Sequence, residues 1–147
     1  MSTIIQFEEI ISWQEARTLS KNIGKLIDEG RFKHSYRLIS QIEASAGSIM
    51  DNIAEGFERS GNKEFIQFLY IAKGSCGELR SQLYRALDRD YINQSEFNQL
   101  SNHAMRISSL IQKLVIAMGN SEFKGTKYKS KINARNRLHE PSNLLNL

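Results

Sequence analysis

The sequence predicts an all-α protein folded as an antiparallel, up-and-down four-helix bundle. The chain has 147 residues and a single proline, Pro141, so nearly everything before that position can be helical. Val115 is its one valine, and no alternating apolar run indicates a strand. Four amphipathic segments joined by short connections follow one another, which is the pattern of an antiparallel bundle.

The first two helices are expected over residues 12–29 and 35–57. Ser12 and Glu15 have the spacing of a capping box at the start of the first helix, and Gly30 is placed to end it. The second helix carries two adjacent apolar lines, an arc wider than one packing partner requires. The lines are Ile39, Ile42, Ala46, Ile49 and Ile53, and beside them Gly47, Met50, Ala54 and Phe57.

The other two helices are expected over residues 62–88 and 93–118. Gly61 is placed to end the second helix, Asn62 to cap the third, and Glu96 to complete a capping box with Asn93 at the start of the fourth. The third helix opens with "FIQFLYIA", which is apolar almost all round and is therefore either deeply buried or available to another chain. Small residues at 74–77 in the same helix indicate close approach of another helix.

The charge divides the chain into a neutral bundle domain, residues 1–118, and a basic C-terminal tail, residues 119–147, which we expect to be mobile. The bundle domain has 14 basic and 14 acidic side chains, so the net charge of +4 lies in the tail. The tail either contacts phosphates or keeps the protein in solution. Its candidate phosphate-binding residues are Lys124, Lys127, Lys129, Lys131, Arg135 and Arg137, with a weaker cluster of Arg80, Arg85 and Arg89 in the third helix.

Patterns typical of enzymes or of metal and cofactor sites are missing from the sequence. No Glu precedes a histidine by three residues, as a di-iron bundle requires, and the ligands for zinc are too few. Cys76 lies on the apolar stripe of the third helix and is expected in the core rather than as a reactive thiol. We expect no catalysis, no cofactor and no metal. The acidic N-terminus and the lack of a long apolar run predict a cytoplasmic protein without a membrane span.

The segment "SIMDNIAEGFERSGNKEF", residues 48–65, places polar residues and a glycine on an otherwise apolar helix. We hypothesise that Asn52 and Glu55, three residues apart, clamp the corner between the second and third helices. They would accept hydrogen bonds from the backbone around residues 62–64, or from Arg59 or Lys63. Gly56 would let another backbone approach closely. The alternative is that both polar side chains face water.

The chain resembles a bacterial family of four-helix bundle proteins described as ribosomal S23-like, or as encoded by intervening sequences of 23S rRNA genes. The resemblance covers about residues 7–118. It rests on Trp13-Gln14, Ser48-Ile49, residues 52–56 (NIAEG), Lys63-Glu64-Phe65, Gly74-Ser75 and Glu78-Leu79. The family also includes the accessory variability determinants of diversity-generating retroelements. Those proteins bind nucleic acid through a basic surface and associate with a reverse transcriptase. Many members have adjacent arginines where this chain has Glu43 and Ala44.

The resemblance implies a non-catalytic homo-oligomer, a homopentamer in known members, that binds RNA or DNA, or a nucleic-acid-processing partner such as a reverse transcriptase. The alternative function is a structural scaffold or protein-interaction module without nucleic-acid binding. The structural motif would be Asn52, Glu55, Gly56, Lys63 and Glu64. The candidate oligomer interface is Met50, Phe57, Phe65, Ile66, Phe68 and Tyr70.

Overall fold

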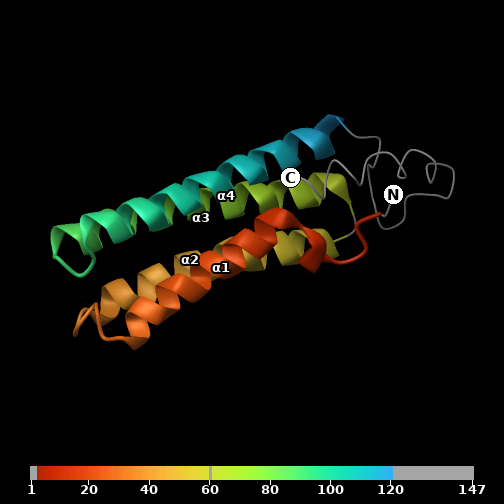
Figure 1. Ribbon diagram of the computed structural model, residues 1–147. Coiled ribbons are helices and arrows are strands. Elements are labelled where there is room, and N and C mark those ends of the chain that lie inside the picture. The colour runs from red at the N-terminus through yellow and green to blue at the C-terminus, as the bar shows by residue number, and fades with distance from the viewer. Residues whose placement is uncertain (1–2, 60, 121–147) are drawn as a thin grey trace, which may run out of the picture.

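The computed structural model describes residues 3–59 and 61–120, and within them it shows a four-helix bundle (Figure 1). A short 3-10 turn, η1 (Phe7–Glu9), precedes α1 (Ile11–Asp28), α2 (Tyr36–Glu58), α3 (Asn62–Asp88) and α4 (Gln94–Asn120). The predicted all-α fold is therefore confirmed. Of the predicted tail, residues 119 and 120 continue α4, and residues 121–147, with all six candidate cations, lie outside the described residues.

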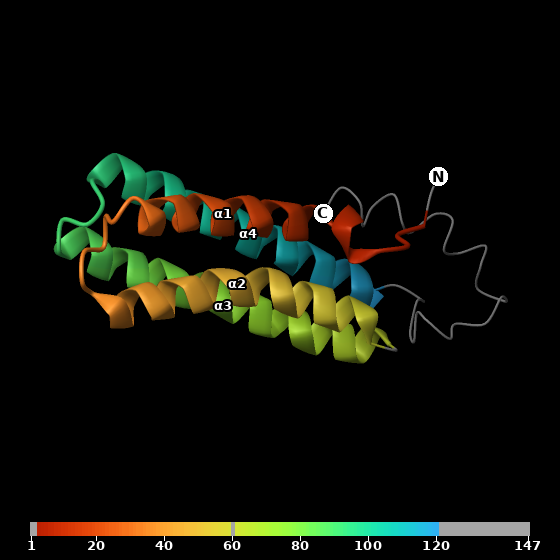
Figure 2. The same cartoon turned by 90° about the horizontal axis from the view of Figure 1, so that it is seen from below.

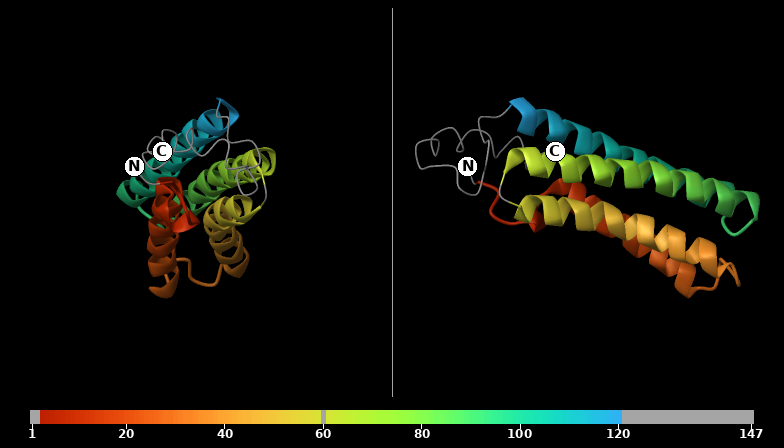
Figure 3. Two further views of the ribbon diagram at one scale, coloured as in Figure 1. Left: turned by 90° about the vertical axis from the view of Figure 1, so that its right-hand side faces the viewer. Right: turned by 180° about the vertical axis from the view of Figure 1, so that it is seen from behind.

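The four helices form a ring in chain order, as the end-on view in Figure 3 shows. Each helix packs on the next, and α1 closes the ring against α4. The two hairpin loops lie together at one end, which we call the loop end, at the left of Figures 1 and 2. The α2–α3 connection, η1 and the last turn of α4 lie at the other end, which we call the corner end.

The core follows the predicted heptad-like spacing because one stripe of each helix faces the bundle axis. On α4 the apolar residues at spacings of three and four are all buried, namely Phe97, Leu100, Ala104, Ile107, Leu110, Leu114 and Met118. On α3 Leu69 is fully buried and Phe68 is only half-buried, so the apolar opening of this helix turns Leu69 inward. The second line of α2 is partly covered, with Met50 and Phe57 packed at the edge of the core.

The start of α1 differs from the prediction. A capping box does form, but upstream, where the Glu9 carboxylate accepts hydrogen bonds from the backbone N–H groups of Ile5 (2.7 Å) and Gln6 (2.9 Å). Ser12 lies inside the helix, and its buried hydroxyl has no hydrogen-bond partner among the described residues. Glu15 instead reaches α4, where its Oε1 lies 3.0 Å from Nε2 of His103. The η1 turn moves the helix start upstream of Ser12.

The start of α3 also differs from the prediction. Gly61 occupies the N-cap position, and Asn62 is the first helical residue rather than the cap. Its buried side-chain amide donates to the backbone carbonyl of Met118 at 3.3 Å, so Asn62 satisfies an acceptor at the end of α4. The Asn93–Glu96 capping box on α4 is confirmed, with reciprocal hydrogen bonds of 2.8 and 2.9 Å.

The clamp predicted for Asn52 and Glu55 is not formed as a shared network. Asn52 donates to the backbone oxygen (2.8 Å) and the hydroxyl (2.9 Å) of Ser48 on its own helix. Ser48 in turn accepts from the Ser75 hydroxyl at 2.9 Å, which links α2 to α3 at mid-length. Glu55 is exposed and pairs at 3.0 Å with Arg59, one of the partners predicted for it, at the end of α2.

Gly56 is buried where α3 crosses α2. The close approach that the sequence predicts does occur, but it is made by side-chain atoms of α3 rather than by another backbone. A Cβ atom at this position would lie 2.5 Å from Cβ of Phe68 and 3.1 Å from a ring carbon of Phe65. Lys63 and Glu64 are exposed in the first turn of α3. At Gly74 and Gly77 no described helix of this chain makes the predicted close approach, because apart from the local helix backbone no described atom lies within 4 Å of the place that a Cβ atom would take there.

Candidate nucleic-acid interface at the loop end

Both loops at the loop end begin with the same helix-ending geometry, the Schellman motif. After α1, Gly30 has a φ of 75°, its N–H bonds to Ile27 O, and the N–H of Arg31 bonds to Leu26 O. After α3, Asp90 takes the left-handed position with a φ of 61°, and the corresponding bonds run from Asp90 N to Leu87 O and from Tyr91 N to Ala86 O. The two helices therefore end in matching turns.

Two contacts then fix one loop against the other. Nη1 and Nη2 of Arg31, in the first loop, donate hydrogen bonds to the two carboxylate oxygens of Glu96 on α4, at 2.8 and 2.6 Å. This ion pair lowers the pKa of Glu96 from its ordinary value, an effect that the hydrogen bond from Asn93 N reinforces. The ring of Phe32, which is 1% exposed, packs on the ring of Tyr91 with centroids 5.8 Å apart.

The two loops together line a hollow of about 540 Å³, which we call the loop-end pocket. Its lining residues are Lys33, His34, Ser35, Tyr36, Arg37, Arg89 and Tyr91. Three of them are exposed cations, and the described residues that line the pocket include no carboxylate. Lys33 has a φ of 55°, a left-handed conformation that costs a non-glycine residue about 1–2 kcal/mol.

The structure separates the three arginines that the sequence grouped in α3. Arg89 lines the loop-end pocket, with its guanidinium carbon 5.1 Å from the centre of the Tyr91 ring. Arg85 donates to the side-chain oxygen of Gln41 on α2 at 2.9 Å. Arg80 is half-buried, and its Nε has no hydrogen-bond partner among the described residues. Only Arg89 therefore joins the basic pocket.

Sequence reasoning missed Lys33, Tyr36 and Arg37, although a signal was present. The segment "RFKHSYR", residues 31–37, interleaves cations with aromatic residues, a composition typical of nucleic-acid-binding surfaces. Helical periodicity treats residues 31–34 only as a connection and residues 35–37 only as the start of the second helix. Its partner Arg89 is far away in the sequence, and only the fold brings it to the same pocket.

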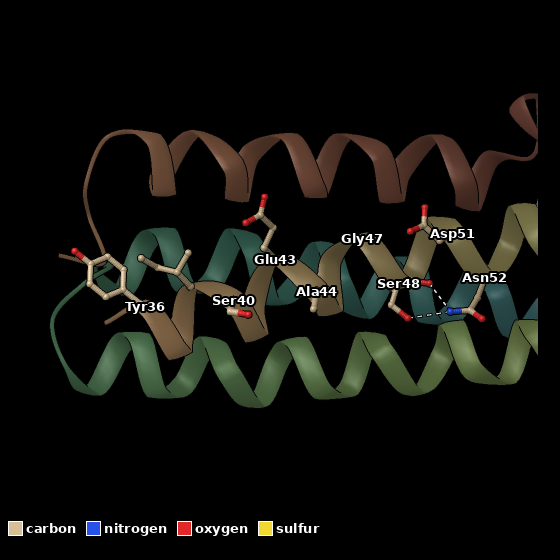
Figure 4. A pocket seen from close by; sticks show the side chains of 9 residues that line it. Tyr36, Ser40, Glu43, Ala44, Gly47, Ser48, Asp51 and Asn52 are labelled. Carbon is tan, nitrogen blue, oxygen red and sulfur yellow. Dashed lines mark hydrogen bonds between the residues drawn. The ribbon is translucent and has the colours of Figure 1, made fainter. Parts of the chain in front are cut away.

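A second hollow, of about 580 Å³, runs along the outer face of α2, and we call it the α2 groove. Figure 4 shows it from close by, with the small side chains Ser40, Ala44 and Ser48 along one edge of the helix and the carboxylates Glu43 and Asp51 along the other. The groove therefore carries negative charge. Tyr36 lines both hollows, so the basic pocket and the acidic groove adjoin at this ring.

No group of three or more His, Cys, Asp or Glu side chains among residues 3–59 and 61–120 is placed to hold a metal ion. Cys76 is buried as predicted, and burial raises the pKa of its thiol to about 12, which suppresses the reactive thiolate. None of the described helices is both long and apolar enough to cross a membrane.

Comparison with protein families identifies the bundle. The model of the 23S rRNA-intervening sequence protein family matches residues 8–113, which include nearly all of the four helices. The chain belongs to this family. The match begins within η1 and covers the loop end completely, so the loop-end pocket is built on the family's own scaffold.

A solved structure shares the fold of this chain. It is a protein of unknown function from the S23 ribosomal protein family of Bacteroides thetaiotaomicron VPI-5482, with 21% sequence identity and a TM-score of 0.67. The similarity covers 71% of the present chain and 98% of the other. No curated protein matches the chain in sequence. The resemblance predicted from the helix motifs is confirmed at the level of family and fold.

Proposed function

We propose that this protein is a non-catalytic homo-oligomer, a pentamer, that binds nucleic acid or a nucleic-acid-processing enzyme such as a reverse transcriptase. The observation that carries nucleic-acid binding is the loop-end pocket, where the two loops and the first turn of α2 gather Lys33, Arg37 and Arg89 without a lining carboxylate. Phosphate contacts from Lys and Arg supply most non-specific affinity for nucleic acid. The family's association with 23S rRNA intervening sequences is consistent with such a ligand.

Self-association is supported by apolar surface that the single chain leaves open. Tyr70 and Ile71 are adjacent on α3, and each is 52% exposed. Gly74 and Gly77 follow on the same helix with open space around them, so a second copy can supply the close approach that the chain itself does not. The candidate interface residue Phe65 is buried within the chain, whereas Met50, Phe57, Ile66 and Phe68 are half-buried.

The acidic α2 groove favours a protein rather than a nucleic acid as its occupant. The carboxylates of Glu43 and Asp51 line this groove, and they would repel the negatively charged phosphates of a nucleic acid. In the proposed assembly the loop end contacts nucleic acid, whereas the sides of α2 and α3 contact other copies or a protein partner. A reverse transcriptase would be a partner of this second kind.

Filter binding of the full chain to RNA and to DNA, titrated with salt, tests the proposal. We expect measurable affinity at about 50 mM salt that falls steeply with added salt. Two double variants then show how much each region contributes to the affinity. They are Lys127→Gln/Lys129→Gln in the tail and Arg37→Gln/Arg89→Gln at the loop end. Absence of binding at low salt would contradict nucleic-acid binding and favour the alternative function, a structural scaffold. Retention of a protein partner after nuclease treatment would support that alternative.

Sedimentation tests the oligomer separately. We expect a particle several times heavier than the 16.9 kDa chain, and a lighter particle after Tyr70→Glu, which places a charge in the proposed interface. Thr18→Glu, on the exposed side of α1, adds the same charge outside that interface and is the matched control. A single 16.9 kDa particle at micromolar concentration would contradict the proposal.

A further inference from the structure

The loop-end pocket carries an aromatic platform as well as cations. Tyr36, the first residue of α2, is 69% exposed, an unusual position for a ring of this size. Its hydroxyl lies 3.0 Å from Nδ1 of His34, and the centroids of the two rings are 5.9 Å apart. The hydrogen bond holds the phenol in place while leaving much of the ring open to solvent.

Two of the three cations around this platform, Lys33 and Arg89, adjoin the buried Phe32–Tyr91 contact. Lys33 follows the buried Phe32, whose ring contacts Tyr91, and the Lys33 N–H bonds to Gly30 O at 3.1 Å. Arg89 lies over the same Tyr91 ring from the other loop. A guanidinium that lies over an aromatic ring keeps the N–H groups at its edge available to bind a phosphate. The strained backbone of Lys33 places its side chain at the pocket.

The size of the basic area limits what can bind. At Tyr36 the loop-end pocket meets the α2 groove, where Glu43 and Asp51 reverse the charge. A long phosphate backbone would therefore meet repulsion soon after it passes the ring. A pocket of about 540 Å³ is within the range of small-ligand sites and has room for one nucleotide.

We propose that the loop-end pocket binds one unpaired nucleotide of a single strand, with its base stacked on Tyr36 and the flanking phosphates on Lys33, Arg37 and Arg89. This inference rests on the proposed nucleic-acid binding and specifies its substrate class. A base offers its face to an aromatic side chain only when it is unpaired, and such stacking tolerates any base. The protein therefore recognises single-stranded ends, loops or bulges in preference to a continuous duplex.

Fluorescence anisotropy of the full chain with three probes tests the preference. The probes are a short oligouridylate, the same oligomer with abasic residues, and an RNA duplex with the same number of phosphates. We expect the oligouridylate to bind about 5- to 100-fold more tightly than the abasic oligomer, which is the usual range for one stacked base. Equal affinity for all three probes would overturn the inference.

Substitutions at the ring separate stacking from folding. Tyr36→Ala should reduce oligouridylate affinity to that of the abasic oligomer and leave abasic affinity unchanged. Tyr36→Phe keeps the ring, loses only the hydrogen bond to His34, and should retain most of the affinity. Tyr84→Ala, at a tyrosine that is 52% exposed and lies outside both the pocket and the proposed oligomer interface, is the matched control. A Tyr36→Ala protein that still prefers the oligouridylate would overturn the inference.

Lys33→Gly separates phosphate binding from stability. Glycine adopts the left-handed backbone without strain, so the melting temperature should stay level or rise. Affinity should nevertheless fall, and the salt dependence should lose about 0.7 from its slope, the contribution of one phosphate contact to a single strand. Lys21→Gln on α1 is the control and should change neither. An unchanged slope in Lys33→Gly would overturn the role of Lys33.

The outcomes also distinguish this inference from the proposed function on which it rests. If the full chain binds RNA and the pocket variants leave that binding unchanged, nucleic-acid binding stands, and its site is elsewhere. If the full chain binds no nucleic acid at low salt, both proposals fail together. If the duplex binds as tightly as the oligouridylate, this inference fails and the proposed nucleic-acid binding stands.

Discussion

The two ends of the bundle are closed by different kinds of interaction. At the corner end, α2 and α3 pack directly: Gly56 admits Phe68, and the rings of Phe57 and Phe65 meet edge to face with centroids 5.8 Å apart. At the loop end, hydrogen-bonded turns and the Arg31–Glu96 ion pair add polar contacts to the buried Phe32–Tyr91 ring contact. Apolar packing leaves little polar surface, whereas polar closure leaves charged side chains at the surface, where they can bind a ligand.

The close packing of the corner end predicts the largest effect of a small substitution. Gly56→Ala adds a Cβ atom at 2.5 Å from Cβ of Phe68, which lies next to the backbone and cannot move alone. Overpacking of about 1–3 kcal/mol should exceed the gain of about 1 kcal/mol that alanine brings to a helix. We expect a melting temperature lower by several degrees, measured by circular dichroism.

Gly24→Ala is the matched control for this change. Gly24 lies in α1, and no described atom is within 4 Å of the position of its Cβ. Only the helix propensity should change, so the variant should be more stable by about 0.5–1 kcal/mol. If both alanine variants were stabilised alike, the view of the corner end as a tightly packed contact would be wrong.

The polar closure of the loop end predicts an intermediate, pH-dependent effect. Glu96→Gln removes the charge that pairs with Arg31 and should cost about 1 kcal/mol at neutral pH. Because the pairing lowers the pKa of Glu96 in the folded protein, its stabilisation is complete above the ordinary glutamate pKa of about 4.3. It is lost as the pH falls through the lower folded value.

Urea unfolding of the wild type and of Glu96→Gln at several pH values measures this difference. The difference in free energy of unfolding between the wild type and Glu96→Gln should be constant between about pH 6 and 8, and it should disappear below about pH 4. A gap that did not depend on pH would show that the glutamine variant disturbs packing rather than charge. The contrast between a polar and an apolar end would then lose its main support.

The smallest effect is expected for the exposed polar pair at the corner end. Glu55 and Arg59 have side chains that are 54% and 50% exposed, so solvent screens their attraction. Glu55→Ala should change the free energy of unfolding by less than about 0.5 kcal/mol and leave the sedimentation profile unchanged. A loss comparable with that of Glu96→Gln would restore the clamp that the sequence predicted and show that this end also depends on charge.

The errors in the sequence prediction have a common physical origin. Helix spans and the buried stripes follow from local spacing, and they agree with the structure to within a few residues. Spacing predicts local capping roles for Ser12, Asn62 and Glu15, yet two of them serve distant helices: Asn62 bonds to the end of α4, and Glu15 contacts His103. A polar side chain takes the partner that the fold offers, and sequence spacing shows only its nearby alternatives.

The sequence by itself determined that this chain forms four amphipathic helices, that Gly56 permits a close crossing, and that the family is that of the 23S rRNA-intervening sequence proteins. These properties depend on periodicity and on local motifs, which involve residues close together in the sequence. Only the tertiary structure decided that Lys33, Tyr36, Arg37 and Arg89 share one pocket and that Arg85 and Arg80 do not. Such a pocket depends on how two loops far apart in sequence meet, and their meeting is set by packing across the whole bundle.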